Sequence, residues 1–544
     1  MGILDRLRGS KINPVCEVDN RVVNTGEGRS LTTRQIAIES VTSDKFKWSA
    51  AAALFALCVA PTFISYQPYL FNGWDDAQYF QRAIEASRAF WTGNGQGLLA
   101  AMVSIRPPAM TLLGLPWGPL ASWNDAGRCF ITLTAVISFL AALCMYLMMR
   151  IGVKPFFLVA ASICVFASMG PYPHPQAEAH VHATGFLADS LFAWTILAAL
   201  LLIPYEARIH CTSTGSAVLR GILWGLILSL GVMTKFSFFY FVVLIIPVLL
   251  FIKFYQDGLR HVLTALIAFA CCSIPPAFYL LRWGRTAFET AKDYSFGSNA
   301  GFFYVPLRSF LHWEIRLSPG IGLSFMLMAA ALIYLLTKKR LTQSWPDFAA
   351  LLIVTGFGIV VLASTNRHIR YEFPAFVALP FLTGILMSGK GRSVPRPYAA
   401  LAAGFVLCGL IAASVPTGHR PDRQYLSRCE AVLAQAVRCH AKRIVLATDS
   451  PTLNGDLMDL AMKFSAPTVS VDNLAYQAMM GVPIEEDFHT ISESDQVVFQ
   501  DRRELTPAFT NQRVSEYEHY IRQGESVAVR VGNDITVYSM HCKP

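Results

Sequence analysis

Charged residues are scarce in this chain of 544 residues: Asp, Glu, Lys and Arg make up 15% of it, whereas apolar residues make up 54%. This balance excludes a disordered or fibrous protein and disfavours a purely soluble enzyme. The sequence also lacks a Walker-type glycine-rich loop and a paired CxxC motif. Neither ATP nor a nucleotide sugar is therefore indicated as the energy source. A polytopic membrane protein with a soluble appendage remains.

The charge is unevenly spread along the chain. Residues 1–419 hold 32 Lys and Arg against 19 Asp and Glu, whereas residues 420–544 hold 13 against 17. The last part is about twice as densely charged, as expected of a soluble domain. No basic strip of the nucleic-acid-binding type occurs, so no nucleic acid is expected as a partner. The positive charge is expected to face anionic membrane lipids or phosphate.

Three regions follow from these patterns. We expect a cytoplasmic N-terminal segment at 1–47, a transmembrane domain at 48–418 with an external loop at 69–125, and an extracytoplasmic α/β domain at 419–544. A spanning helix needs roughly 20 apolar residues, and the sequence predicts about 11 of them. The stretch 107–121 is apolar but short, so it predicts a re-entrant or interfacial segment. The predicted spans are 48–68, 126–149, 155–171, 185–204, 218–234, 236–252, 262–281, 318–336, 347–364, 371–388 and 397–415.

Lys and Arg in the short loops predict the orientation. With the N-terminus in the cytoplasm, every second loop is basic, whereas the short opposite loop at 172–184 holds neither Lys nor Arg. Eleven spans then place the C-terminal domain in the periplasm or its equivalent, and one miscounted span would reverse that placement. The basic residues of the cytoplasmic loops are Arg150, Lys154, Arg208, Arg220, Lys253, Arg260, Lys338, Lys339, Arg340, Lys390, Arg392 and Arg396.

The first external loop opens with two adjacent carboxylates, Asp75 and Asp76. Such a pair can hold a divalent metal ion, or one carboxylate can deprotonate an acceptor hydroxyl. Alternatively, one of them caps a helix from about 77 to 90. Further along the loop, Arg106 precedes Pro107 and Pro108. This pattern suits either phosphate binding or an anchor at the membrane interface.

The second external loop carries a Glu-x-His-x-His run that ends in His180 and His182. These residue types are metal ligands, although solvated loop histidines have the same appearance. Asp189 lies just inside the next predicted span, where a carboxylate is costly and indicates function. Lys235 lies at an external turn within an apolar stretch. It can either snorkel to the interface or face a lipid phosphate.

A basic cluster opens a late span at the external surface. It contains Arg367, His368, Arg370 and Tyr371. Arginine forks suit phosphate, and external basic residues run against the positive-inside trend. The cluster therefore favours chemistry over mere anchoring.

The C-terminal region predicts a small α/β domain. Residues 443–448 read as a buried strand, followed by turn residues and a helix at about 455–464. Further strands are expected at 467–471, 496–500, 526–531 and 534–540. The expected role of this domain is acceptor recognition or partner docking.

In their order, these motifs resemble the C-superfamily of membrane glycosyltransferases, in particular the group of protein O-mannosyltransferases and lipid A aminoarabinose transferases. The resemblance covers about residues 48–390. Ile105 departs from the pattern, because some relatives carry an acidic residue or His there, and this weakens the carry-over of a metal. The matching pieces are Asp75-Asp76, Arg106-Pro107-Pro108, Arg128, Asp189, Gly231-x-x-Thr234-Lys235 and Arg367-His368-x-Arg370-Tyr371.

The resemblance implies an inner-membrane transferase that takes a sugar from a polyprenyl-phosphate carrier. The acceptor, an envelope glycan, lipid or protein, would be met on the periplasmic side, and direct attack would invert the anomeric carbon. Asp75 or Asp76 would be the catalytic base, with Arg106, Lys235, Arg367 and Arg370 binding the donor phosphate. The residues that would line the site are His180, His182, Asp189, His368 and Tyr371. The resemblance assigns no particular cofactor, and a divalent metal ion is the one candidate.

A secondary transporter or a flippase for lipid-linked sugars is the rival interpretation. It explains many spans and intramembrane charges equally well, but it predicts internal repeats and polar residues near the midplane. The two halves show no convincing repeat, and the notable polar residues gather at one surface. A non-catalytic scaffold would leave the Asp75-Asp76 and Arg367–Arg370 clusters unexplained. The sequence therefore favours the transferase.

Overall fold

The computed structural model describes most of the chain from residue 74 onward. The two compact units of the chain are Met1–Ser49 and Ala50–Pro544, and all elements below belong to the second. The described residues are 49, 74–102, 106–121, 125–169, 188–296, 329, 333, 345–364, 369–388, 424–450, 452–466, 468–475, 477–478, 481–501, 511–524 and 526–540.

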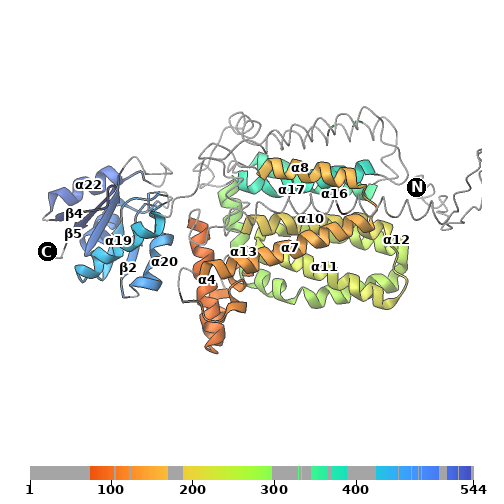
Figure 1. The fold of residues 1–544 in the computed structure, drawn as a ribbon, viewed down its shortest axis with the longest axis horizontal. Helices are drawn as coiled ribbons and strands as arrows, with labels where there is room; N and C mark the ends of the chain where they lie inside the picture. The colour runs from red at the N-terminus through yellow and green to blue at the C-terminus, as the bar shows by residue number, and fades with distance from the viewer. Residues whose placement is uncertain are drawn as a thin grey trace, which may run out of the picture. The chain divides into compact units, whose positions relative to one another are not determined.

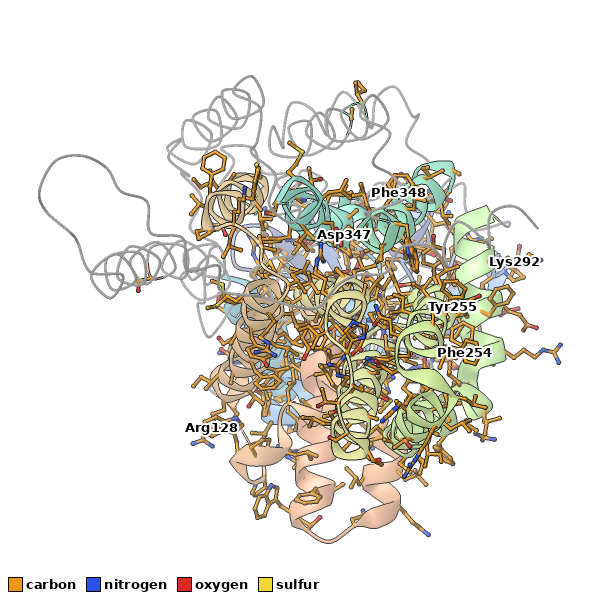
Figure 2. The ribbon with its side chains drawn as sticks, turned by 90° about the vertical axis from the view of Figure 1, so that its right-hand side faces the viewer. Arg128, Phe254, Tyr255, Lys292, Asp347 and Phe348 are labelled. Atoms are coloured by element: carbon orange, nitrogen blue, oxygen red, sulfur yellow. The ribbon has the colours of Figure 1, made fainter. Side chains whose placement is uncertain are left out.

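Long apolar helices form a bundle around α10 (Ala188–Arg208), which is buried along almost its whole length. It contacts helices on all sides, and Figure 1 shows it in the middle of the bundle. Large apolar side chains such as Phe254 and Tyr255 are exposed on the outside of α12 (Figure 2), as expected of a surface that faces lipid. The other bundle helices are α7 (Ala126–Arg150), α8 (Pro155–Met169), α11 (Thr214–Thr234), α12 (Phe239–Cys272), α13 (Ile274–Phe296), α16 (Trp345–Ala363) and α17 (Ile369–Ser388).

Four of the described helices are long and apolar enough to cross a membrane by length and composition: Ile131–Arg150, Ala188–Arg208, Thr214–Thr234 and Phe236–Cys272. Shorter apolar helices cover Pro155–Val165, Trp345–Val361 and Val377–Ser388. The predicted span at 397–415, and nearly all of those at 48–68 and 318–336, lie outside the described residues. The predicted total of about 11 spans therefore stays a prediction.

Helix α12 contains a reversal of the chain, which explains why two spans were predicted in one helical stretch. Phe238 at its start packs on Gly231 near the end of α11. The Nζ of Lys253 lies 3.5 Å from the carbonyl of Ile209, before α11 begins. Cys272 then lies beside Ser229, again near the end of α11. The backbone leaves helical geometry at Gly258, with φ of 79° and ψ of 167°, values that glycine adopts without strain.

The segment before the bundle forms helices α4 (Trp74–Trp91), α5 (Gly95–Met102) and α6 (Ala109–Leu112) and the 3₁₀ turn η1 (Leu115–Trp117). Side chains of α4 hold the turn region that follows α6. The indole of Trp91 donates to the carbonyl of Leu115 at 2.8 Å, and the guanidinium of Arg88 donates to that of Leu120 at 2.7 Å. The short turns agree with the prediction that 107–121 is not a span.

The C-terminal region is a five-stranded sheet with helices on both faces (Figure 1). Strands β1, β2 and β3 are parallel, whereas β5 is antiparallel to both β3 and β4, which gives the order β2-β1-β3-β5-β4. The elements in chain order are α19 (Gln424–Arg438), β1 (Arg443–Leu446), α20 (Gly455–Ser465), β2 (Ser470–Asn473), α21 (Ile484–Ser492), β3 (Gln496–Gln500), α22 (Val514–Gln523), β4 (Val527–Val531) and β5 (Ile535–Ser539).

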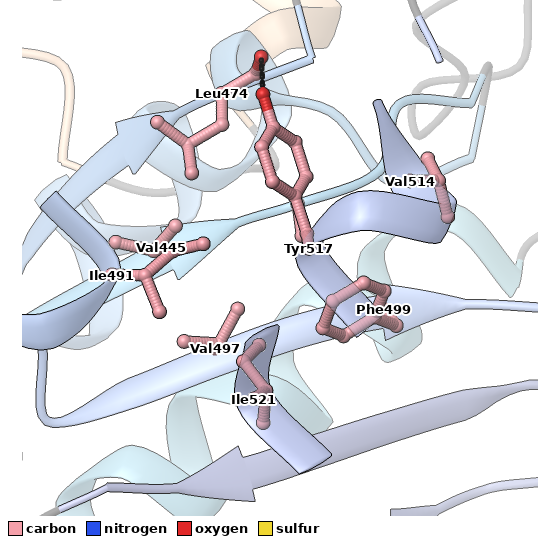
Figure 3. Close-up of a cluster of buried hydrophobic side chains, with 9 residues drawn as sticks. Val445, Leu474, Ile491, Val497, Phe499, Val514, Tyr517 and Ile521 are labelled. Carbon is pink, nitrogen blue, oxygen red and sulfur yellow. Dashed lines mark hydrogen bonds between the residues drawn. The ribbon is translucent and has the colours of Figure 1, made fainter. Parts of the chain in front are cut away.

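An apolar cluster on one face of this sheet provides the core of the domain (Figure 3). Val445 of β1 and Val497 of β3 are paired in the ladder and both are fully buried. Ile521 and Tyr517 of α22 cover them, and the hydroxyl of Tyr517 donates to the carbonyl of Leu474 at 3.5 Å. Each predicted strand and the predicted helix have a counterpart, although β2 begins three residues later than expected.

Candidate functional site

Asp75 and Asp76 lie in the first turn of helix α4, which begins at Trp74. The sequence offered Asp75 or Asp76 as the cap of a helix from about 77 to 90. That alternative is wrong in its boundary, because the helix begins at Trp74 and both residues lie inside its first turn. The first turn of a helix favours negative charge because its backbone N–H groups are unsatisfied. The side-chain positions of Asp75 and Asp76 lie outside what the structure describes.

Arg106 lies over the ring of Tyr79, one turn further along α4, with 5.2 Å between its guanidinium carbon and the ring centroid. Burial and the neighbouring charge of Arg106 lower the pKa of Arg82. Two cationic side chains thus share one neighbourhood next to the Asp75-Asp76 turn. Two cations in one neighbourhood attract an anion, and phosphate binding by Arg106 stays a prediction. Arg82 was not predicted from the sequence, although its i+3 spacing from Tyr79 was a usable signal.

Gly114 allows α4 and the turn after α6 to approach closely. A Cβ at this position would lie 2.9 Å from the carbonyl oxygen of Ala83. The hydroxyl of Ser87 also donates to the carbonyl of Gly118. Pro107 and Pro108, which follow Arg106, are both buried.

Asp189 and Lys235 form an ion pair at the same end of the bundle. The Nζ of Lys235 lies 2.5 Å from a carboxylate oxygen of Asp189 and 5.4 Å from the ring centroid of Phe192. Lys235 follows the last residue of α11 in extended geometry, which confirms the predicted break. Helix α6 contacts α11, so this pair and Arg106 belong to neighbouring elements. Lys235 therefore has a specific partner in Asp189, and its predicted role at a lipid phosphate stays a prediction.

Gly231 makes room for the turn that presents Lys235. A Cβ here would lie 2.4 Å from the ring of Phe238, which belongs to the 3₁₀ turn η3 (Phe236–Phe238). The backbone N–H of Lys235 also donates to the carbonyl of Gly231 at 3.0 Å. The Gly-x-x-Thr-Lys pattern thus forms the end of α11, where the close contact between Gly231 and Phe238 sets the position of Lys235.

The structure describes only some of the remaining predicted site residues. Arg370 and Tyr371 lie in the first turn of α17, which packs against α10, but their side chains are not described. His180, His182, Arg367 and His368 lie outside the described residues. Within the ranges that the structure does describe, no group of three His, Cys, Asp or Glu side chains could hold a metal ion.

A buried ion network lies at the opposite end of the bundle, and the sequence did not predict it. One carboxylate oxygen of Glu206 lies 2.6 Å from both Arg220 and Lys253, and Lys253 lies 2.6 Å from Asp257 as well. The indole of Trp224 donates to Glu206 at 3.0 Å. Arg220 and Lys253 had been assigned to cytoplasmic loops, whereas both are largely buried and neutralised by carboxylates.

Arg208 also lies at this end of the bundle, 2.6 Å from Asp347. A cavity nearby is lined by Arg150, Arg208, Ile385 and Ser388 among others. It is remote from Asp189, because Arg208 ends the helix that Asp189 begins. The cavity is therefore not part of the candidate site.

The fold agrees with the resemblance that the order of motifs had indicated, because two solved structures share it. Two solved structures are similar along nearly the whole chain: ArnT from Cupriavidus metallidurans bound to undecaprenyl phosphate, and the same protein in the apo state. Each gives a TM-score of 0.51 and covers 91% of this chain and 99% of its own, at 13% and 12% sequence identity respectively. No protein family model and no curated protein matches the sequence.

Proposed function

We propose that this chain is a multi-pass inner-membrane glycosyltransferase that uses a polyprenyl-phosphate-linked sugar as its donor. One observation carries the proposal: the likeness to ArnT extends over 91% of the chain, and that protein has been solved with undecaprenyl phosphate bound. The acceptor is an envelope glycan, lipid or protein, and transfer takes place on the periplasmic side. The likeness does not favour the transporter or flippase alternative.

The reaction needs a base and a positive environment for the leaving phosphate. An acceptor hydroxyl attacks the anomeric carbon, and its proton passes to the carboxylate of Asp75 or Asp76. The bond from that carbon to the phosphate oxygen breaks, and polyprenyl phosphate leaves with the electron pair. Attack opposite the leaving group inverts the anomeric carbon. Asp189, His180, His182, His368 and Tyr371 are proposed to line the site.

Basic side chains stabilise the departing phosphate. Arg106 is one of them, because the cationic neighbourhood that it shares with Arg82 attracts an anion. Lys235 is another, held in place by Asp189 until the phosphate arrives. Arg367 and Arg370 complete the proposed set. A low-dielectric membrane surface strengthens each of these interactions.

A transfer assay tests the proposal. Purified protein in lipid is given radiolabelled sugar on polyprenyl phosphate, with a cell-envelope extract as the acceptor. We expect label on the acceptor for the wild type and its loss in folded Asp75→Asn or Asp76→Asn. Glu486→Gln, exposed on α21, is the control with unchanged transfer. Label that stays on the carrier across a broad donor panel, or normal transfer by both Asp variants, would refute the assigned site.

A further inference from the structure

Helix α20 of the C-terminal domain packs along helix α4 in parallel register. The side-chain amide of Gln78 donates to a carboxylate oxygen of Asp456 at 2.6 Å. Seven residues further along each helix, Lys463 pairs with Glu85. Both pairs join residues 378 positions apart in the sequence. Because seven residues make two helical turns, the two helices run in the same direction side by side.

Aromatic contacts fill the space between these polar pairs. The ring of Phe80, which is fully buried, lies 6.4 Å from that of Phe464 between centroids. Arg88 lies over the same Phe464 ring at 6.0 Å. Arg88 also donates to the carbonyl of Leu120, so it connects α20 to the turn region that follows Arg106. The contact therefore combines packing with specific pairs.

The register brings the turn after β1 level with the first turn of α4. One helical turn before Gln78 is Asp75, and the equivalent position before Asp456 is Leu453. The turn around Leu453 is rigidly built, because the hydroxyl of Ser450 accepts the N–H of Leu453 at 3.0 Å. Asn454 then caps α20 by accepting the N–H of Leu457 at 3.0 Å. The turn around Leu453, which is level with the Asp75-Asp76 turn, is thus itself held by hydrogen bonds.

We infer that the C-terminal domain holds the first turn of α4 in place for transfer, with Gln78, Glu85, Asp456 and Lys463 as positioning residues. This inference rests on the proposed function, in which Asp75 or Asp76 is the base. Reaction rates depend steeply on the placement of a catalytic group, and a shift of about 1 Å can cost about a hundredfold. Loss of docking should therefore lower kcat, and restoring a broken pair should restore it.

A cross-linking experiment tests the docking without reference to activity. Gln78→Cys combined with Asp456→Cys, in the full chain in lipid, should form a disulfide between residues 78 and 456 on mild oxidation. Peptide mass spectrometry distinguishes this bond from disulfides of native cysteines. The matched control is Gln78→Cys with Glu486→Cys, whose second cysteine lies on α21. Absence of the 78–456 disulfide overturns the inference.

Charge reversal tests the positioning role. Lys463→Glu and Glu85→Lys alone should each lower kcat about tenfold or more, and the double variant, which restores the pair with its charges exchanged, should recover most of the loss. Glu486→Lys is the control for a charge change elsewhere on the domain. Single variants with wild-type kcat overturn the positioning role even if the cross-link forms. A wild type that transfers no sugar refutes the proposed function and this role together, while the cross-link still reports the docking.

Discussion

Asp189 is a carboxylate in the first turn of α10 with only 4% of its surface exposed. An isolated charge in such a place is costly, and the ammonium of Lys235 compensates for it. The sequence singled out both residues separately, because each interrupts an apolar stretch. It could not show that they meet, since they belong to different helices whose packing is a tertiary property. The two residues therefore stabilise each other in the fold, whether or not a substrate is bound.

Removing the lysine should therefore cost stability as well as activity. Lys235→Met leaves a buried carboxylate without its ammonium, and we expect a loss of about 3–5 kcal/mol in the free energy of unfolding. The double variant Asp189→Asn/Lys235→Met should recover most of that loss but remain inactive, because the phosphate-binding charge is gone. Thermal unfolding in lipid measures the first effect. Equal destabilisation in the single and double variants would contradict the role of the pair.

Gly231 should be intolerant of even one added methyl group. Gly231→Ala places a Cβ 2.4 Å from the ring of Phe238, so the turn before α12 must shift. We expect a destabilisation of about 1–3 kcal/mol, together with reduced transfer because Lys235 is displaced. Gly358→Ala in α16 is the matched control, since a Cβ there meets nothing within 4 Å. Similar unfolding temperatures for the two variants would argue against the close contact.

Asp459 on α20 predicts a pH dependence of stability. Burial, and then the charges of Asp456 and Asp472, raise its pKa from 3.8 to about 6. The folded state thus binds this proton more tightly than the unfolded state, so stability falls as the pH rises from about 4 to about 6 and then levels off. Asp459→Asn should raise the unfolding temperature at about pH 7 and have little effect near pH 4. Calorimetry of the full chain at both pH values measures this, and an equal effect at both would contradict it.

At the scale of elements, the hydrophobic pattern predicted those strands and helices whose apolar residues form a clear local run. The strands of the C-terminal domain and helix α20 were predicted because buried apolar runs are bounded by turn residues. Helices α19, α21 and α22 were missed, since each buries only a narrow apolar face among many polar residues. The predicted spans at 236–252 and 262–281 lie on the two arms of α12, the second continuing into α13, and the chain reverses between the arms at Gly258. The sequence predicted that reversal, because it placed a loop with Lys253 and Arg260 between the two spans.

The ion network around Glu206 links three helices of the bundle: α10, α11 and α12. Glu206→Ala leaves Arg220 and Lys253 competing for the remaining carboxylate, so we expect a loss of about 3 kcal/mol or more in stability. The exposed pair of Arg285 and Glu289 on α13 is the matched comparison. Arg285→Ala should change stability far less, because solvent screens an exposed ion pair. Denaturation in detergent measures both, and comparable losses would show that the buried network is not a structural junction.

At the scale of the whole molecule, the α4 segment and the C-terminal domain are in contact. The sequence had assigned both regions to the external side from loop charges, and that assignment stays a prediction. The docking of α20 on α4 was not predictable, because its partners are 378 residues apart and nothing local marks them. Of the site, the sequence singled out Asp75, Arg106, Asp189 and Lys235, but not their geometry.

The central claim is that the carrier is cleaved during transfer, and product analysis tests it most directly. Purified protein in sealed liposomes is given a polyprenyl-phosphate sugar and an acceptor, and mass spectrometry quantifies the free polyprenyl phosphate. The account predicts one free polyprenyl phosphate for each sugar transferred, with the anomeric configuration inverted in the product. Intact carrier that crosses the bilayer, with neither free polyprenyl phosphate nor glycosylated acceptor, would contradict the account and identify a flippase instead.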